Sequence, residues 1–318
     1  MKALDWEVLE AARDWLRAGL HTWLCTIVAT AGSSPRPVGA MLACNGRGEQ
    51  RGSLSGGCIE DDLLQRIVDG DMPEVPAQVI PYGVTAEQNE RLGLPCGGHL
   101  QVLVQTLSTG DLSWLEEVLT ALVRRRCLRR DIDLASGATA LRTVEEFTAL
   151  EFGAGRVAHT LGPRQRMLLV GAGQLSQSLA ELALAMDYEV LVTDPREALR
   201  QHWSGPVLPL LGGMSDDAVR EHITDAHSIV ITLTHDPRID DMALMEALAS
   251  PAWYVGALGS QRTTLGRLER LRQLGFSQDQ LASLHAPVGL DIGSKTPLEI
   301  AVAIMAQLTA LQRRLPPR

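Results

Sequence analysis

Lysine is nearly absent from this sequence of 318 residues: Lys2 and Lys295 are the only two, so almost all of the positive charge is carried by arginine. A Schiff-base mechanism would have to rest on Lys295, and no GxxxxGK[ST] phosphate-binding loop occurs. Aromatic residues make up only 4% of the chain, too few for a surface on which nucleic-acid bases stack. These shortages argue against a pyridoxal enzyme, a P-loop NTPase and a nucleic-acid binder.

Long apolar runs and an excess of positive charge are also missing. The formal net charge is -9 at pH 7, so no basic field attracts nucleic acid. No stretch approaches the roughly 18 apolar residues of a membrane span, and Asp5 and Glu7 lie where a signal peptide would need an apolar core. We therefore expect a cytoplasmic protein with no membrane partner.

Cysteines are few and scattered. The five are Cys25, Cys44, Cys58, Cys96 and Cys127. They form no CxxC pair and no Cys/His cluster with zinc spacing, so we expect reduced thiols and no metal site.

The length favours two domains. A polar segment, Gly162–Arg166, separates two kinds of pattern, which gives an N-terminal domain over residues 1–162 and a C-terminal domain over residues 163–318. In the first, helical periodicity and extended runs are mixed, and this predicts a mixed α/β domain. The expected helices cover 4–18, the segment from Cys58 and 111–126, and the expected strands cover 22–30, 40–45, 51–55, 77–82 and 99–107.

Strand and helix alternate throughout the second domain. Short apolar strands are expected at 167–170, 189–194, 227–234 and 252–257, separated by helices, and a long helix over 296–315 ends the chain. This alternation is typical of a parallel sheet with helices on both faces, so we predict a Rossmann-like, doubly wound domain.

A glycine-rich turn follows the first of these strands. In Gly171–Ser176 (GAGQLS), Gly171 permits a tight turn, Gly173 lets a phosphate approach the backbone, and Gln174 begins a helix whose free N–H groups favour an anion. Asp194 ends the next strand, where an acidic residue can accept hydrogen bonds from a ribose diol. Two interpretations stand: a nucleotide- or phosphate-binding turn, or a Rossmann turn that has kept its shape and lost its ligand.

Further candidates lie at the ends of other strands, where open α/β sheets place their ligands. They are Arg196, His235 in THDP (234–237) and Gly259 in GALGS (256–260). A lone histidine is more often structural, but His235 is expected at the edge of the sheet where ligands bind. A structural role and contact with a ligand are therefore equally favoured for His235. Lys295 precedes a capping box, so it flanks a helix rather than being a buried amine.

Two loops of the N-terminal domain are candidates for anion binding. Gly32-Ser33-Ser34-Pro35-Arg36-Pro37 offers hydroxyls and a guanidinium fork for a phosphate or carboxylate, with a plain turn and a solvated arginine as the alternative. Ser53-Leu54-Ser55-Gly56-Gly57-Cys58 runs from a strand into a helix, which would leave several N–H groups free as an anion cradle.

Two thiols lie beside paired glycines. We expect the helix start to favour the thiolate form of Cys58, and the carboxylates of Glu60, Asp61 and Asp62 to oppose this effect. Cys96, before Gly97 and Gly98, has a similar setting. Each is either a reactive thiol or a buried inert cysteine.

These segments together resemble the XdhC/CoxI family of accessory factors for molybdenum hydroxylases. The matching segments are GSSPRPVGAML (32–42), GSLSGGCIE (52–60), PCGG (95–98), GAGQLSQSLA (171–180), TDPR (193–196), LTHDP (233–237), YVGALGSQRT (254–263) and APVGLDIGSKTPLEIAVAIM (286–305). They occur in order in both domains. The departures are Gln174, where the family usually has histidine, and Ser176, where it usually has glycine.

The resemblance implies a chaperone that binds the molybdenum cofactor, as molybdopterin or its cytosine dinucleotide form, and inserts it, often after sulfuration, into an apo molybdenum hydroxylase. Xanthine dehydrogenase and aldehyde oxidoreductase are such clients. The implied partners are that client and a cysteine desulfurase, and the implied assembly is a homodimer. On this interpretation the chain is more a carrier than an enzyme.

One hypothesis for the cargo combines these loops. The Gly171 turn receives the phosphate or pyrophosphate, and Arg36 with the Gly56–Cys58 turn approaches the pterin or molybdenum end, which requires one shared cleft. The alternative function is an NAD(P)-dependent oxidoreductase that uses the Gly171 turn, with His235 as its only candidate proton donor. A nucleotide sensor or scaffold is a third class.

Overall fold

The computed structural model describes residues 4–32, 34, 36–83 and 99–314. It divides into two compact units, one ending at Pro163 and the other beginning at Arg164, and each is described by itself. No helix of the described residues is long and apolar enough to cross a membrane.

The N-terminal unit contains a five-stranded antiparallel sheet in the order β3-β2-β1-β5-β4. Its strands are β1 (Thr22–Ala31), β2 (Met41–Asn45), β3 (Gln50–Gly52), β4 (Ala77–Tyr82) and β5 (His99–Leu107). The strand expected over 51–55 is wrong beyond Gly52, because the residues after it turn toward a helix. That helix, α2 (Cys58–Asp69), begins at the predicted residue.

Helices cover both faces of this sheet. Helix α2 packs Ile59 and Leu63 against one face, whereas α1 (Leu4–Arg17) and α4 (Leu112–Val123) pack against the other. A short 3-10 turn, η1 (Thr109–Asp111), precedes α4. Because both faces are covered, the central strand β1 is a nearly continuous apolar run, buried from Thr22 to Val28.

A second antiparallel sheet of the N-terminal unit has the order β7-β6-β9-β8. Its strands are β6 (Cys127–Asp133), β7 (Thr139–Val144), β8 (Glu151–Gly153) and β9 (Arg156–Leu161). Ile132 and Val157 of this sheet share a buried cluster with Val28 and Leu103 of the first. The mixed α/β character predicted for this half is thus confirmed, and both of its sheets are antiparallel.

The C-terminal unit is a parallel sheet of six described strands in the order β12-β11-β10-β13-β14-β15. The strands are β10 (Arg166–Val170), β11 (Glu189–Thr193), β12 (Leu210–Leu211), β13 (Ser228–Thr232), β14 (Tyr254–Ala257) and β15 (Leu284–His285). Renumbered from β10, this is the Rossmann order 3-2-1-4-5-6. The predicted doubly wound fold is confirmed.

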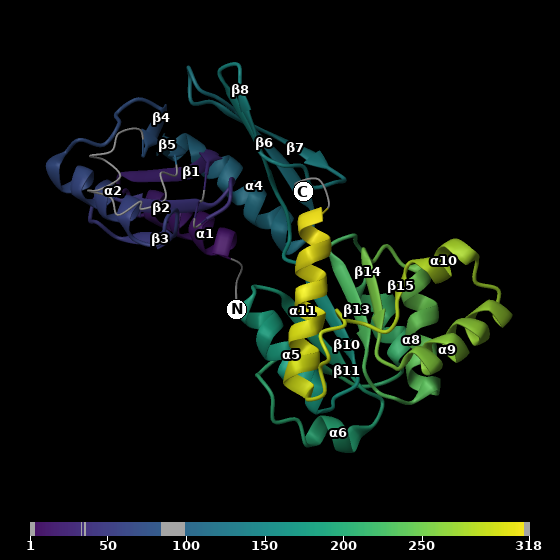
Figure 1. The fold of residues 1–318 in the computed structure, drawn as a ribbon. Coiled ribbons are helices and arrows are strands. Elements are labelled where there is room, and N and C mark those ends of the chain that lie inside the picture. The colour runs from purple at the N-terminus through teal and green to yellow at the C-terminus, as the bar shows by residue number, and fades with distance from the viewer. Residues whose placement is uncertain (1–3, 33, 35, 84–98, 315–318) are drawn as a thin grey trace. The chain divides into compact units, whose positions relative to one another are not determined.

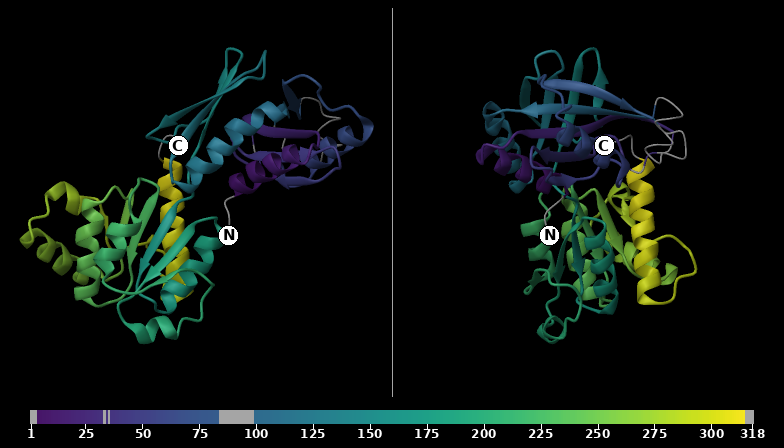
Figure 2. Two further views of the ribbon diagram at one scale, coloured as in Figure 1. Left: turned by 180° about the vertical axis from the view of Figure 1, so that it is seen from behind. Right: turned by 90° about the vertical axis from the view of Figure 1, so that its left-hand side faces the viewer.

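Helices lie on both faces of the parallel sheet (Figure 1). Helices α5 (Gln174–Ala185) and α11 (Pro297–Arg314) bury their apolar residues in one core, and Figure 2 shows α11 in yellow along this side of the unit. The other core is formed with α7 (Ser215–His222), α8 (Pro237–Ala249), α9 (Gln261–Gln273) and α10 (Gln278–Ala282). The short helix α6 (Glu197–Gln201) follows β11.

Candidate functional site

The loops after β10, β11 and β13 lie at the carboxyl edge of the C-terminal sheet. β10 and β13 are neighbours, yet the helices that follow them, α5 and α8, pack on opposite faces. Open α/β sheets bind ligands at such a switch point. These loops carry predicted site residues that the structure therefore brings to one edge: Gly171, Gly173, Asp194, Arg196 and His235.

Gly171 is held in a conformation that favours glycine. Its φ is +114°, and a Cβ atom built there would lie 2.9 Å from Cγ2 of Thr234. Its N–H donates to the carbonyl of Thr193 at 2.7 Å, which ties the turn to the end of β11. The glycine therefore lets three loops approach one another closely.

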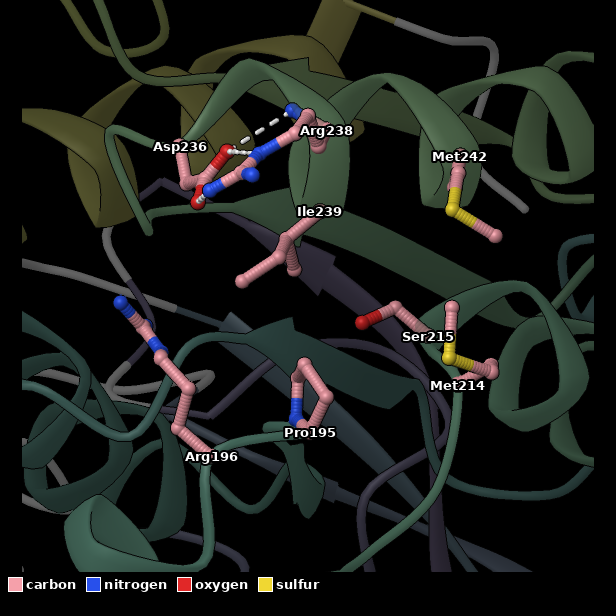
Figure 3. A pocket seen from close by; sticks show the side chains of 8 residues that line it. All are labelled: Pro195, Arg196, Met214, Ser215, Asp236, Arg238, Ile239 and Met242. Carbon is pink, nitrogen blue, oxygen red and sulfur yellow. Dashed lines mark hydrogen bonds and ion pairs between the residues drawn. The ribbon is translucent and has the colours of Figure 1, made fainter.

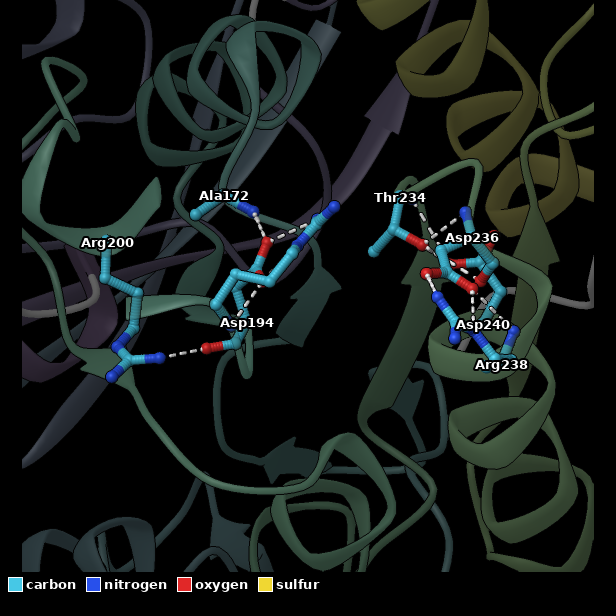
Figure 4. A network of polar contacts seen from close by, with 8 residues as sticks. Ala172, Asp194, Arg200, Thr234, Asp236, Arg238 and Asp240 are labelled. Atoms are coloured by element: carbon cyan, nitrogen blue, oxygen red, sulfur yellow. Dashed lines mark hydrogen bonds and ion pairs between the residues drawn. The ribbon is translucent and has the colours of Figure 1, made fainter. Parts of the chain in front are cut away.

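Asp194 is fully buried and bonded to the turn. Its Oδ2 accepts from the Ala172 N–H and from Nη2 of Arg196, each at 2.8 Å, and its Oδ1 accepts from the N–H and Nε of Arg196, each at 2.9 Å. Figure 4 shows the Asp194 carboxylate beside the Ala172 backbone, while Arg200 donates to the Asp194 carbonyl. A carboxylate has about four acceptor positions, and protein donors occupy them here.

The group that this loop presents outward is consequently cationic. The Arg196 side chain is 41% exposed, whereas that of Asp194 is 0% exposed. Burial raises the pKa of Asp194, but the hydrogen bonds from Arg196 and from the Ala172 N–H outweigh it, so its pKa lies below the ordinary value. The sequence predicts a ribose diol acceptor at this position, and the structure places a guanidinium there instead.

A cavity of about 380 Å³, which we call the turn cavity, opens beside these loops. Five predicted residues line it: Gly171, Gly173, Gln174, Arg196 and His235. Gly259 is not one of the described residues that line it, since the residue of its loop that does so is Leu258.

The lining of the turn cavity has a positive bias. Among the described residues that form it, Arg196 and Lys295 are cationic, and none is acidic. Helix α5 begins here after Gly173, so its first N–H groups and the positive end of its dipole face the same region. A phosphate group suits these surroundings better than a neutral or cationic one.

Ser176, at the position of the usual third glycine, also lines the turn cavity. It is 1% exposed, and its Oγ has no hydrogen-bond partner among the described residues. The serine therefore fits the turn sterically and adds a polar atom to the cavity wall.

His235 is held in place by the residues around it. Its φ is +63°, a left-handed conformation that is uncommon for residues other than glycine. On one side, Thr234 donates from its N–H and Oγ1 to Oδ1 of Asp240, at 3.2 and 2.7 Å (Figure 4). On the other, the carboxylate of Asp236 accepts from the N–H of Arg238 at 3.0 Å and caps α8.

Arg267 connects this loop to the next one. It is 2% exposed, donates from Nη2 to Oδ2 of the fully buried Asp240 at 3.2 Å, and donates from Nη1 to the Leu258 carbonyl at 3.0 Å. Burial raises the pKa of Asp240, and Thr234 and Arg267 oppose that rise. One buried ion pair thus fixes two loops that line the turn cavity.

A second cavity of about 360 Å³, here called the methionine cavity, lies beyond Arg196, which lines both. Its walls come from the segments after β11, β12 and β13. They include Pro195, Met214, Ser215, Ile239 and Met242, with Asp236 and Arg238 at the rim (Figure 3).

In the N-terminal unit, Glu60 fills the predicted anion cradle. Its carboxylate accepts from the N–H groups of Leu54, Ser55, Gly56 and Gly57 at 2.7 to 3.2 Å, and from the hydroxyls of Ser53 and Ser55. Burial raises the pKa of Glu60, but these hydrogen bonds hold it well below its usual range. The expectation that these N–H groups remain free for an anion is wrong, because the chain supplies its own carboxylate.

The other N-terminal candidates are placed less closely. Cys58 is half-buried at the first position of α2. Ser34 donates from Oγ to the Arg36 carbonyl at 2.7 Å, and Nε of the half-buried Arg36 has no partner among the described residues. Ser33 and Cys96 lie outside the described residues.

Two family models match this chain. The XdhC Rossmann domain matches residues 167–308, and the XdhC and CoxI family matches residues 3–69. The first covers the parallel sheet with its turn, the second covers the N-terminal sheet as far as α2, and together they take in more than half of the chain. The chain belongs to the XdhC and CoxI family.

This chain is similar to several named proteins over nearly its whole length. It is 26% identical to a protein of Bacillus subtilis (strain 168) that is described as a probable subunit of xanthine dehydrogenase, over 92% of this chain and 93% of that protein. It is 26% identical to the molybdenum cofactor insertion chaperone PaoD of Escherichia coli (strain K12) over 96% of this chain and 88% of that protein. A crystal structure from Bacillus halodurans, described as a xanthine dehydrogenase, has a TM-score of 0.76 and 27% identity, and the match covers 99% and 97% of the two chains.

Several residues of the site have no counterpart among the sequence predictions. The sequence predicts only that Lys295 flanks a helix, yet it lines the turn cavity from the segment before α11. Asp240 and Arg267 form a buried ion pair although they are 27 positions apart in the sequence, and no local sequence pattern predicts this pair. A signal for Glu60 does exist: an acidic residue at the third position of a helix is typical of a capping box.

Proposed function

We propose that this chain is a molybdenum cofactor-binding chaperone that holds the cofactor as cargo and inserts it into an apo molybdenum hydroxylase, such as a xanthine dehydrogenase or an aldehyde oxidoreductase. The observation that carries the proposal is the positive lining of the turn cavity in a chain of net charge -9. Such a cavity suits an anionic cargo that bears a phosphate. Membership of the family, and the likeness to PaoD, support the choice of cargo.

The turn cavity binds the phosphate end of the cargo. The first N–H groups of α5 donate to the phosphate, and Arg196 and Lys295 supply positive charge. Because Arg196 is already bonded to Asp194 along one edge, its guanidinium is preorganised and loses little freedom when it binds. The chaperone role needs no chemical step at these residues.

The finer parts of this proposal concern sulfur and assembly. We propose that the cargo is delivered in its sulfurated form, that a cysteine desulfurase is a partner, and that the protein acts as a homodimer in the cytoplasm. In the N-terminal unit, Cys58 handles sulfur. Replacement of Cys58 by Ala tests the last point: activation of the apo-enzyme should fall while the fold is kept, and unchanged activation would remove Cys58 from the mechanism.

Retention of the cargo tests the function itself. The purified protein is denatured and oxidised, and the fluorescent pterin product is measured per mole of protein. We expect pterin in the wild type, and at least about fivefold less in Lys295→Gln, because one charge in the cavity is lost. The matched control, Arg272→Gln, removes a charge from an exposed residue of α9 that lines neither cavity, and it should retain pterin.

The alternative function, an NAD(P)-dependent oxidoreductase, can be distinguished from the chaperone with the same protein sample. Binding of NADH is followed by protein fluorescence beside the pterin assay. Pterin retention without nicotinamide binding supports the chaperone. Tight NADH binding with no pterin contradicts it.

A further inference from the structure

Buried polar side chains form a layer between the two sheets of the N-terminal unit. On each of the strands β1, β5, β6 and β9, one polar residue lies between two apolar residues of the same strand face, because side chains alternate along a strand. The apolar residues on one side belong to a buried cluster that includes Leu24, Leu107, Leu128 and Leu161. Those on the other side form the cluster of Val28, Leu103, Ile132 and Val157. The polar residues between the clusters, which we call the polar layer, are Thr26, Gln105, Arg130 and His159.

Arg130 brings a positive charge into the polar layer. It is 0% exposed, and its Nε, Nη1 and Nη2 atoms have no hydrogen-bond partner among the described residues. Its guanidinium carbon lies 4.8 Å from the centre of the Trp114 ring, and such a contact compensates only part of the cost of burying a charge. Burial lowers the pKa of Arg130 to about 10, and attraction by Asp111 opposes this fall, so the side chain stays protonated at pH 7. The Asp111 carboxylate itself accepts from Trp114 and Ser108.

The other members of the polar layer do not supply the missing negative charge. Burial and the nearby Arg130 lower the pKa of His159 to about 3, so its imidazole is neutral at pH 7. Within the described part of the chain, Nδ1 of His159, Oε1 of Gln105 and Oγ1 of Thr26 also have no hydrogen-bond partner. A buried charge is strongly unfavourable unless a counter-ion and hydrogen bonds compensate it. The group that this layer requires is therefore negative and accepts hydrogen bonds.

The surroundings of the polar layer suit a small ion better than an extended ligand. Its four side chains belong to residues that are at most 5% exposed, and apolar clusters border it on two sides. Gly39, in the segment between β1 and β2, packs against the imidazole, since a Cβ atom built there would lie 3.3 Å from Nε2 of His159. An ion of the size of a halide needs little room and accepts hydrogen bonds from any direction.

We propose that the polar layer binds one halide-sized inorganic anion, chloride under ordinary conditions, with Arg130 as its counter-cation. The guanidinium N–H groups and the Thr26 hydroxyl donate to the ion, and the neutral imidazole of His159 offers one further N–H. Rotation of the Gln105 amide exchanges its oxygen and nitrogen, so that this group also donates. The ion stabilises the packing of one sheet of the N-terminal unit on the other, and this inference does not rest on the proposed function.

Chloride binding is measured on the full chain by NMR of the chloride ion, whose signal broadens when the ion exchanges with a protein site. The buffer salt is sodium gluconate, whose anion is too bulky for the polar layer. We expect the wild type to broaden the signal and Arg130→Met to bind chloride at least about tenfold more weakly. Arg124→Met removes the same charge from an exposed residue at the end of α4, and it should broaden the signal as the wild type does.

Urea unfolding at constant ionic strength gives a second readout, with sodium gluconate replaced stepwise by sodium chloride. An ion that binds only the folded protein raises the unfolding midpoint as its concentration increases, so the midpoint should rise for the wild type and stay constant for Arg130→Met. Arg130→Met should fold, because it leaves no carboxylate without its cation, whereas Arg267→Met leaves Asp240 unpaired. Thr26→Val conserves the shape of the side chain and removes its hydroxyl, and it should weaken chloride binding about threefold.

Two results would overturn the assignment. Equal chloride broadening by the wild type and by Arg130→Met would show that any bound ion lies elsewhere. An unfolding midpoint of the wild type that does not change with chloride concentration would show that the polar layer holds water and no anion. Retention of pterin enters neither measurement, so this inference and the proposed function are tested separately.

Discussion

The Arg196 guanidinium donates to both carboxylate oxygens of Asp194, from Nε at 2.9 Å and from Nη2 at 2.8 Å. Arg196 neutralises the buried carboxylate and presents its own guanidinium outward, and the Ala172 N–H bonds the same carboxylate to the glycine turn. Asp194 therefore organises the turn, and Arg196 beside it lines the turn cavity.

Asp194→Asn should destabilise the C-terminal unit by about 1.5–3 kcal/mol at pH 7, because an amide cannot accept all of the hydrogen bonds that a carboxylate accepts. The folded pKa of Asp194 lies below its unfolded value, so this stabilisation is present above about pH 4 and is lost as the pH falls through the folded pKa. Urea unfolding of wild type and variant at pH 7 and near pH 3 measures both effects. Asp217→Asn, at an exposed residue paired with Arg220, should change stability by less than about 1 kcal/mol.

Gly171→Ala should destabilise the protein by about 1–3 kcal/mol, since its φ of +114° strains any other residue and the new methyl group would meet Thr234. Pterin retention should fall as well, because the turn must shift. Gly173→Ala is the matched control: its φ is -89° and a Cβ there has nothing within 4 Å. A stability change in Gly173→Ala as large as in Gly171→Ala would contradict this explanation.

Glu60→Gln should cost about 1.5–3 kcal/mol at pH 7, because the amide replaces an acceptor of four backbone N–H groups by a group that partly repels them. The folded pKa of Glu60 is lowered, so the wild type loses this stabilisation as the pH falls below about 4.3. The difference in the free energy of unfolding between wild type and variant should therefore become smaller at low pH. Asp61→Asn, an exposed neighbour in the same helical turn, should differ from wild type by less than about 1 kcal/mol. If the difference in unfolding free energy between wild type and Glu60→Gln does not change with pH, the charge of Glu60 is not the source of the stabilisation.

Arg267→Met should cost about 3–5 kcal/mol at pH 7, because it leaves the fully buried Asp240 carboxylate without its cation. Burial already raises the pKa of Asp240, and removal of Arg267 raises it further. The loss of stability in Arg267→Met should therefore be largest at high pH and become smaller as the pH falls and Asp240 takes up a proton. Thermal unfolding between pH 5 and pH 8 follows this trend, and a deficit that grows toward low pH would contradict it.

The parts of the fold with a strong local signal can be predicted from the sequence. The apolar run of β10, the glycine turn and the start of α5 are contiguous, so the sequence identifies the Rossmann turn together with Asp194. The start of α2 at Cys58 likewise follows from the residues around it.

Other parts depend on contacts between distant residues and cannot be predicted in this way. Met214 and Ser215 reach the methionine cavity because β12, a strand of two residues, pairs with β11, and two residues carry no periodicity. The role of Asp194 differs from the prediction for a related reason: sequence places the acid correctly, but only the side-chain geometry shows that Arg196 occupies its oxygens. The sequence likewise does not show that Glu60 fills the anion cradle, because a motif does not reveal which of its N–H donors are already hydrogen-bonded within the chain.

Lys295 makes the turn cavity accessible to selective chemistry. It is exposed at the cavity wall, and the sequence contains only one other lysine, Lys2. An amine-selective reagent therefore modifies very few positions in this protein, and peptide mass spectrometry can quantify the label at Lys295 against that at Lys2. Cargo in the cavity should slow the labelling of Lys295 alone, so that the scarcity of lysine becomes a direct chemical readout of loading and release.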